Sequence, residues 1–336
     1  MNYLVLKQRF YLVISVLTLI VLGSGYGSCT MFSDRLSDSA MVALDSFHHC
    51  QYMARSRGIG AAGRRSEQFD YANLLSRHTT AEQLVEIANT DTSRITRLWA
   101  YRILLKKADN QVFDVLKQAL KDTTHVEMMS GCSEFEEPYN RAAISIYRYD
   151  SYELKLPNQL CFSLDSLVFF DYMKPCGFER GLLMDFKPHK IYYATIIEEA
   201  DKGNDAILPL LAQYKNPNDR QRINKLLKAL LKEYGICSYE ACRAISNWND
   251  PAFEWYAKAA CQATIKQEYY DADEVLQLLC AYPAPWSYQI LKKLLTQKGD
   301  YSNSDIAKDY LRELYKTSPV PPIFKPLYDR YVARKK

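Results

Sequence analysis

The chain has few histidines and none of the short motifs that mark common enzyme sites. Its five histidines are His48, His49, His78, His125 and His189. None stands in the zinc-protease spacing, which places two histidines four residues apart beside a glutamate. A Gly-x-Ser-x-Gly elbow, a Walker loop and a paired-carboxylate motif are absent from the 336 residues as well. We therefore expect a non-enzymatic protein without catalytic, cofactor-binding or metal-binding residues, although catalytic groups far apart in sequence leave no such pattern.

Net charge is also small. The formal charge of the full chain is +4, and residues 1–28 carry Lys7 and Arg9 without any acidic residue, so their removal leaves +2 (4 − 2). Nucleic-acid binding normally requires a clustered basic face. The near balance of charge therefore gives no reason to expect a nucleic-acid partner.

Residues 1–28 have the composition of an export signal. Lys7 and Arg9 precede an apolar run from Phe10 to Leu22, and small residues follow at Gly25 and Gly27. An uncleaved anchor is the alternative, but the apolar run is short for a membrane span of about 20 residues. We expect an exported protein.

The cysteine that follows this segment suggests a lipid anchor. Tyr26-Gly27-Ser28-Cys29 resembles the lipobox of bacterial lipoproteins, in which small residues precede a lipidated cysteine. Tyr26 departs from the aliphatic residue that is usual at the first position. The resemblance implies lipidation of Cys29 and a periplasmic or membrane-anchored protein, and cleavage before Ser28 is the alternative.

The stretch from Gly203 to Gln297 contains apolar stripes of helix length at a near-constant period. The clearest stripe consists of Ile223, Leu226, Leu227, Leu230, Leu231 and Tyr234. Capping residues at 216–219 precede it, and Gly235 follows it. Polar residues that open helices stand at Asp205, Ser238, Asp271 and Asp305, which are 33, 33 and 34 positions apart.

Later segments repeat this helix pair. Asn249-Asp250-Pro251 offers a cap followed by a proline at the first helical position. The stripe behind it consists of Phe253, Tyr256, Ala257, Ala260, Cys261 and Thr264. The next pair uses Val275, Leu278 and Leu279, then Leu291, Leu294 and Leu295. A two-helix unit cannot bury its apolar face alone, so the period predicts stacked neighbours, with a bundle of unrelated helices as the alternative.

Residues 79–120 carry a resemblance to a known family. Thr79-Thr-Ala-Glu82 reads as a capping box, and Asp91 is followed by Ile95, Arg97 and Ala100. This pattern resembles HEAT-type repeats, with the arginine displaced by one position. The resemblance implies an all-α, right-handed α-solenoid of HEAT-like helix pairs at 79–149 and 189–316. It also implies a curved scaffold that binds a protein or peptide partner.

The region 29–78 reads as a linker followed by helical structure. It contains Gly58, Gly60 and Gly63 in the spacing of a dinucleotide fingerprint. No apolar strand precedes these glycines, so we expect a loop without a cofactor. His48, His49 and Cys50 are adjacent on an expected helix and should point apart, which disfavours a shared metal.

The period is lost after Gly131, and residues 150–188 read as an insertion. The run 160–170 suggests strands, so we expect a small irregular or β insertion there. The predicted partner-binding residues are Tyr192, Tyr193, Trp248 and Trp255, where that insertion should meet the repeats. Prolines at 319–326 predict a C-terminal cap and tail at 317–336.

Nine cysteines leave an even set of eight once Cys29 is set aside. An oxidising compartment would permit disulfides, and the pairs Cys237–Cys242 and Cys161–Cys176 are suggested by spacing. Cys261 and Cys280 occupy apolar helix positions, where buried thiols are common.

Three functional hypotheses follow. The first is an exported, lipid-anchored, HEAT-like scaffold that binds a protein or peptide. The second is an envelope enzyme whose site lies in residues 131–188. The third is a cytoplasmic, DNA-binding HEAT-like protein, which would require a basic concave surface and an N-terminus that is not a signal.

Overall fold

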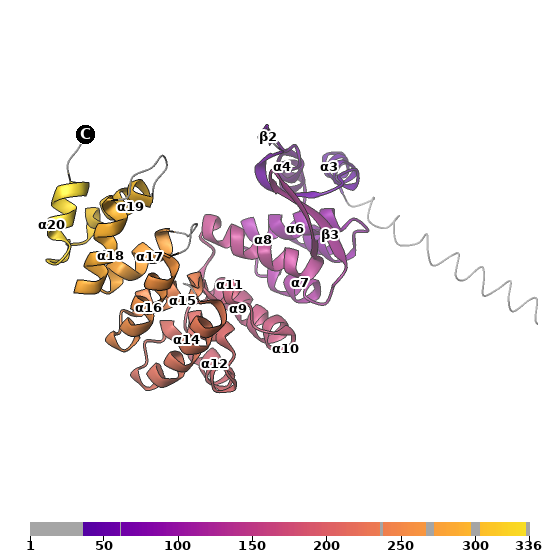
Figure 1. Ribbon diagram of the computed structural model, residues 1–336. Coiled ribbons are helices and arrows are strands. Elements are labelled where there is room, and N and C mark those ends of the chain that lie inside the picture. The colour runs from indigo at the N-terminus through magenta and orange to yellow at the C-terminus, as the bar shows by residue number, and fades with distance from the viewer. Residues whose placement is uncertain (1–35, 61, 236–237, 267–271, 297–302, 334–336) are drawn as a thin grey trace, which may run out of the picture. The chain divides into compact units, whose positions relative to one another are not determined.

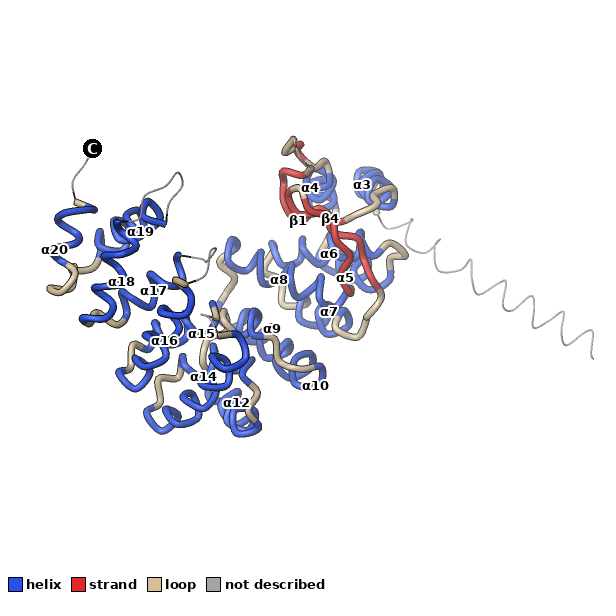
Figure 2. The backbone as a smooth tube through the Cα atoms, in the orientation of Figure 1, coloured by secondary structure: helices blue, strands red, loops and turns tan. Residues whose placement is uncertain are grey.

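The computed structural model describes residues 36–60, 62–235, 238–266, 272–296 and 303–333 (Figure 1). Helices account for most of these residues, and the strands are confined to one small sheet (Figure 2). The expectation of an all-α protein is confirmed in part, because the protein is predominantly α-helical but also contains this sheet. The predicted export segment and Cys29 lie outside the described residues. The chain forms two compact units, an N-terminal unit that ends at Tyr172 and a C-terminal unit that begins at Met173.

The N-terminal unit contains seven of the described α-helices. They are α3 (Asp38–His48), α4 (Gln68–His78), α5 (Ala81–Thr90), α6 (Arg94–Lys106), α7 (Val112–Ala119), α8 (Tyr139–Leu154) and α9 (Asn158–Leu167). From α5 onward alternate helices touch, because α5 contacts α7, α7 contacts α9 and α6 contacts α8. The core of this unit is centred on Trp99, whose ring stacks on Phe47 at 5.7 Å and meets the edge of Phe69 at 5.0 Å.

The start of α5 lies one residue later than the sequence suggested. Thr80, not Thr79, is the N-cap, and its capping box closes with Gln83 instead of Glu82. Thr79 donates its hydroxyl to the Leu75 carbonyl oxygen at the end of α4. Two adjacent threonines and two adjacent long polar residues satisfy the same motif, so the spacing alone did not define the register.

A four-stranded sheet lies in the N-terminal unit, with strand order β2-β1-β3-β4. Its strands are β1 (Met53–Ile59), β2 (Arg64–Arg65), β3 (His125–Gly131) and β4 (Ser133–Pro138). β1 pairs in parallel with β3, and the other two pairings are antiparallel. Helices α4 and α6 contact β1, and α8 contacts β3 and β4.

The expected β insertion at 150–188 is wrong. The run read as strands is α9 followed by the π-helix η1 (Val168–Met173), and α10 (Lys174–Cys176) and α11 (Arg180–Leu183) come next. Leu160, Leu164 and Leu167 are buried along one side of α9. Their spacing is helical, but the following apolar residues Val168–Phe170 masked it, because short apolar runs fit both periods.

The glycine-rich segment is also not a simple loop. Gly58 lies on β1, and the turn to β2 passes through Gly60 at φ 70° and Gly63 at φ 59°. A dinucleotide fingerprint places its glycines between a strand and a helix, whereas these join two antiparallel strands. The turn instead uses glycine at the two positions where a side chain would be strained.

The C-terminal unit is built from helices that alternate between two sets. The first set is α13 (Leu208–Gln213), α15 (Tyr239–Trp248), α17 (Ala272–Ala281) and α19 (Asn303–Thr317), and the second is α12 (Lys190–Lys202), α14 (Arg220–Tyr234), α16 (Glu254–Thr264) and α18 (Pro285–Thr296). Each member of a set contacts the next member of the same set. The first-set helices begin at Leu208, Tyr239, Ala272 and Asn303, which are 31, 33 and 31 positions apart.

Helix α14 forms as its sequence predicts. Its buried residues are Ile223, Leu226, Leu227 and Leu230, and Gly235 closes it in the left-handed conformation. The predicted helix openers fit less well. Asn204 rather than Asp205 caps the 3-10 turn η2 (Asp205–Ile207), Asp305 lies inside α19, and Asp271 lies outside the described residues.

The last described elements are α20 (Lys325–Leu327) and the π-helix η5 (Tyr328–Val332), and η5 contacts α19. Phe324, Leu327 and Val332 are buried there. No helix in the described ranges has both the length and the apolar character that crossing a bilayer requires.

Candidate binding surface

The turns between paired helices in the C-terminal unit are held by side-chain caps. Asn216 accepts from the Asn218 N–H at 3.1 Å and opens the 3-10 turn η3 (Pro217–Asp219). Asp250 accepts from the Ala252 N–H at 2.9 Å and opens the equivalent turn η4 (Pro251–Phe253). A proline follows each cap, which suits the first helical position because its missing N–H needs no partner.

A side chain from an earlier helix also forms hydrogen bonds with each capped turn. Tyr193 on α12 donates its hydroxyl to Asp219 at 2.8 Å and accepts from the Asn216 amide at 2.5 Å. Arg220 at the start of α14 donates to Asp250 through Nε at 2.8 Å and Nη2 at 2.6 Å. Both aspartates are buried, so these bonds replace the water that the carboxylates lose on folding.

Indole N–H groups join the second-set helices to one another. Trp255 on α16 donates to Asn224 on α14 at 2.6 Å. Trp286 on α18 donates to Glu254 on α16 at 2.8 Å. The second-set helices thus carry a polar link between each neighbouring pair from α14 to α18.

The four predicted partner-binding residues do not form one exposed patch. Tyr192 is buried and its ring lies 5.9 Å from that of Phe186, so it belongs to the core. Tyr193 is half-buried and holds the η3 turn, and Trp248 is half-buried against the edge of Phe253 at 5.1 Å. Trp255 alone among the four is exposed, with 37% of its surface accessible.

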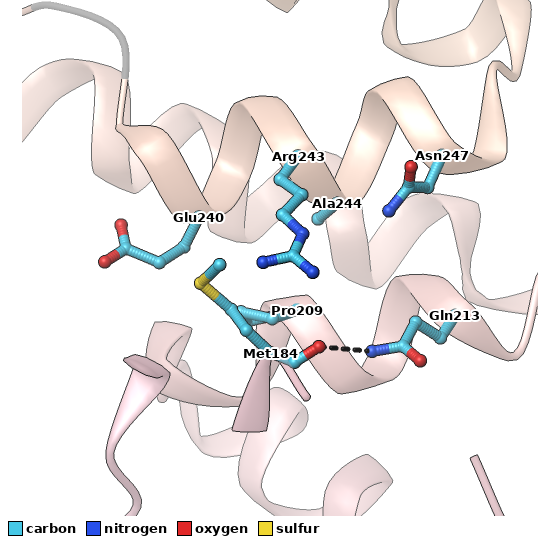
Figure 3. A pocket seen from close by; sticks show the side chains of 7 residues that line it. All are labelled: Met184, Pro209, Gln213, Glu240, Arg243, Ala244 and Asn247. Atoms are coloured by element: carbon cyan, nitrogen blue, oxygen red, sulfur yellow. Dashed lines mark hydrogen bonds between the residues drawn. The ribbon is translucent and has the colours of Figure 1, made fainter. Parts of the chain in front are cut away.

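A shallow hollow lies between α13 and α15 (Figure 3). The Arg243 guanidinium extends over it, and the Gln213 amide donates to the Met184 carbonyl oxygen at 3.3 Å on its floor. Its empty space, open solvent included, is about 190 Å³. Small-molecule sites usually measure about 300–1,000 Å³ and are mostly apolar, so this hollow is not a substrate pocket.

A second hollow lies at the η4 turn, beside the turn between α17 and α18. Its empty space, open solvent included, is about 410 Å³. The nearby Tyr282 hydroxyl points inward, 3.2 Å from the Ile245 carbonyl oxygen and 3.3 Å from that of Asp250. Burial raises the pKa of Tyr282, and the charges of Asp250 and Glu254 raise it further. The tyrosine is therefore a neutral structural bridge.

The alternative hypothesis placed an enzyme site in residues 131–188. In the part of that segment that belongs to the N-terminal unit, residues 131–172, a tight polar cluster is found. The Tyr147 hydroxyl lies 2.7 Å from Asp165 and 3.1 Å from the Cys161 carbonyl oxygen, and Arg148 pairs with Asp165 at 2.8 Å. Burial raises the pKa of the Tyr147 hydroxyl, and the charge of Asp165 raises it further. The cluster joins α8 to α9, and its carboxylate is already occupied by two protein partners.

The adjacent histidines make separate contacts. His48 Nε2 lies 2.9 Å from the Asp91 carboxylate, whereas His49 Nδ1 lies 2.7 Å from the Asp45 carbonyl oxygen. Cys50 donates its thiol to the Ser46 carbonyl oxygen. Within the described ranges, no three His, Cys, Asp or Glu side chains are grouped so that they could hold a metal ion.

Cys161 and Cys176, which spacing suggested as a pair, are both present as thiols. Cys161 donates its thiol to the Leu156 carbonyl oxygen, and Cys176 is an exposed thiol. Cys242 is buried, and its predicted partner Cys237 lies outside the described residues. Cys261 is buried as expected, and Cys280 is half-buried beside Tyr315.

No protein-family model, curated protein or solved structure matches this chain. The class that the structure establishes is a predominantly α-helical protein with a small four-stranded sheet. Among its sequence-predicted site residues, Trp255 is an exposed aromatic side chain that bonds Asn224, and Tyr193 bonds Asp219 at the η3 turn.

Proposed function

We propose that this protein is a non-catalytic scaffold of HEAT-like helix pairs, an α-solenoid in the C-terminal unit, that binds a protein or peptide partner. The single observation that carries the proposal is the alternation of contacts, in which α13, α15, α17 and α19 follow one another while α12, α14, α16 and α18 do the same. Repeats that contact their neighbours in this manner expose long, regular surfaces, and such surfaces suit partner binding.

Polar contacts from one helix pair to the next support the same proposal. In the N-terminal unit Arg97 on α6 pairs with Asp122 at 3.1 Å, beyond the end of α7. In the C-terminal unit Arg220 pairs with Asp250 at the next capped turn. Both arginines stand near the start of the second helix of a pair and reach an aspartate in the next pair. The resemblance of Asp91, Ile95, Arg97 and Ala100 to HEAT repeats adds to this inference.

We propose that the partner binds an outer surface rather than a pocket. The hollow of Figure 3 is small, and the polar groups beside the η4 turn bond inward. An exposed aromatic ring held by a hydrogen bond offers contact area at low entropic cost, which favours the surface around Trp255.

A photoreactive benzoylphenylalanine at position 255 of the full chain tests this surface in cells. We expect a crosslink to one or a few defined polypeptides. The matched control carries the same group in place of Ile306, which is exposed at 45% on the first-set helix α19. Equal crosslinking from both positions, or none from position 255, would remove Trp255 from the binding surface.

We also propose export and lipid attachment at Cys29, supported by the apolar run 10–22 and the lipobox-like residues 26–29. Radiolabelled palmitate should label the full chain in the membrane fraction, and Cys29→Ser should abolish the label. An unlabelled chain that keeps Met1 and fractionates with the cytosol would contradict both statements.

A further inference from the structure

The three helices α14, α16 and α18 carry an unbalanced charge. Their basic residues are Arg220, Arg222, Lys225, Lys228, Lys232, Lys258, Lys292 and Lys293, and their acidic residues are Glu233 and Glu254. The first-set helices α13, α15 and α17 carry one basic residue, Arg243, and three acidic residues, Glu240, Asp273 and Glu274. The two sets therefore differ in the sign of their charge, although the chain as a whole is nearly neutral.

The arginines and lysines of these helices have different roles. Arg220 bonds Asp250, and Arg222 bonds both Asp201 at 2.7 Å and Asp219 at 3.2 Å. The hydrogen bond from Arg222 lowers the pKa of Asp201, and the positive charges of Arg222 and Lys225 lower it further. These guanidinium groups are used within the protein and hold neighbouring helix pairs together.

The lysines are instead exposed, and no ion pair joins any of the six to a carboxylate in the described part of the chain. On α14, Lys225, Lys228 and Lys232 follow a spacing of three and four residues, which keeps them on one side of the helix, opposite its buried stripe. We call the six lysines together with Trp255 the lysine face.

The lysine face is carried by three helices that follow one another. α14 contacts α16, and α16 contacts α18. The Lys228 ammonium lies 6.0 Å from the centre of the Trp255 ring, so the indole stands between the lysines of α14 and those further along. Six like charges on one surface repel one another, and an anionic partner would relieve that repulsion.

We infer that the lysine face binds an acidic segment of a polypeptide, with Trp255 packing against a side chain between its carboxylates. This inference rests on the proposed scaffold function and names the chemistry of the partner. At the usual spacing of about 8–10 Å between packed helices, three neighbouring helices span about 20 Å, which an extended chain of about six residues covers. Carboxylates at alternate positions of such a segment would meet ammonium groups from successive helices.

Two other anionic partners fit the surface less well. Nucleic-acid recognition favours arginine forks and open aromatic faces, but the arginines here are bonded to aspartates and the indole N–H is bonded to Asn224. Membrane binding requires apolar side chains that enter the lipid, and Trp255 is the one large exposed apolar residue on the lysine face. An acidic polypeptide needs neither feature.

The test uses the full chain and a fluorescein-labelled peptide in which glutamate alternates with glycine around a central tyrosine. Fluorescence anisotropy should show binding that weakens as ionic strength rises, because exposed ion pairs are screened. Lys225→Gln, Lys228→Gln and Lys258→Gln together should weaken binding about tenfold. Lys292→Gln with Lys293→Gln is a second variant of the same face, and its affinity should fall too.

The matched control removes the same number of charges elsewhere, through Lys117→Gln, Lys121→Gln and Lys316→Gln. All three lysines are exposed and none belongs to the lysine face. Their loss should leave peptide affinity unchanged. Thermal unfolding of every variant should match the unaltered chain, since exposed lysine substitutions rarely change stability.

Equal loss of affinity in control and face variants would overturn the inference, because it would show attraction to net charge alone. Binding of a single-stranded oligonucleotide or of phosphatidylserine vesicles, without binding of the acidic peptide, would overturn it as well. A chain that crosslinks a polypeptide through position 255 in cells but ignores the acidic peptide would keep the scaffold function and remove only the acidic partner.

Discussion

Arg220 directs two N–H groups at one carboxylate oxygen of Asp250, at 2.8 Å and 2.6 Å. Asp250 at the same time caps the η4 turn by accepting from the Ala252 N–H. One buried side chain therefore fixes the start of α16 and ties it to the start of α14. Loss of that carboxylate removes a helix cap and a contact between helix pairs together.

Asp250→Ala should lower the free energy of unfolding by about 2–4 kcal/mol, because a cap and a buried, paired charge are both lost. Asp250→Asn keeps an oxygen that can cap and should cost less. Urea unfolding followed by circular dichroism measures both. Asp305→Ala is the control, since that exposed aspartate bonds only Lys308 within the described residues and should change stability by less than about 0.5 kcal/mol.

A double-mutant cycle with Arg220→Ala separates the two contributions. The Arg220 side chain is partly exposed, so its pair with Asp250 should couple by about 1 kcal/mol rather than by the full value of a buried pair. Additive effects of the two substitutions would show that Asp250 acts as a cap alone.

Gln68 bridges the sheet and two helices of the N-terminal unit. Its amide oxygen accepts from the Trp99 indole at 2.8 Å and from the Ala54 N–H at 3.0 Å, and its amide nitrogen donates to the Tyr52 carbonyl oxygen at 2.7 Å. Gln68→Leu should destabilise the protein by about 2–4 kcal/mol, because it leaves the buried N–H groups of Trp99 and Ala54 without an acceptor. Gln118→Leu on the exposed side of α7 should be nearly neutral in the same unfolding assay.

The local pattern of the chain predicts those helices whose stripe and caps are both present. α14 has an uninterrupted stripe between the Asn216 cap and Gly235, and α16 follows the Asp250-Pro251 cap, so their periodicity and ends agree. Where two neighbouring residues satisfy the same rule, as Thr79 and Thr80 do, the boundary moves by one position.

The sheet could not be predicted in this way. β1 carries arginines and a serine where an alternating strand would carry apolar residues, and it pairs with β3, which is remote in sequence. Besides this pairing, side chains from other elements bond its backbone, such as Arg102, which donates to the Ala54 and Arg55 carbonyl oxygens. Such non-local contacts have no signal in a short window of sequence.

For the candidate site, the sequence pattern indicates which side chains are buried and which are exposed at two places. Tyr192 is spaced with Ile196 and Ala200 as part of a buried stripe, which marks it as core rather than surface. The lysines of α14 stand opposite a leucine stripe, which marks them as exposed. Their alignment with Trp255 depends on the contact between α14 and α16, which only the three-dimensional fold defines.

Acid should weaken the link between Arg97 and Asp122. Burial tends to raise the pKa of Asp122, but hydrogen bonds from Thr124 and Arg97 outweigh it and lower that pKa. A lowered carboxyl pKa stabilises the folded state above the unfolded value of about 3.9, and this contribution is lost as pH falls through the folded value. Asp122→Asn should therefore cost about 1 kcal/mol at neutral pH and progressively less below pH of about 4.

The measurement compares urea unfolding of the two chains across this pH range. Asp309→Asn controls for general charge effects, because Asp309 is exposed on α19 and pairs only with its neighbour Arg312 among the described residues. A constant difference between the unaltered chain and Asp122→Asn at all pH values would show that the ionised carboxylate does not contribute.

Native alkylation should divide the cysteines by burial. Cys132 and Cys176 are exposed and should react with iodoacetamide within minutes, whereas Cys242 and Cys261 are buried and should react only after unfolding. Burial raises the pKa of Cys280 to about 12, a hydrogen bond from Tyr315 opposes the rise, and the thiolate that reacts is therefore scarce. Peptide mass spectrometry before and after urea measures each site. Rapid native labelling of Cys242 or Cys261 would contradict the packing of α15 and α16. If Cys176 reacted only after a reductant had been added, it would form a disulfide in place of the exposed thiol.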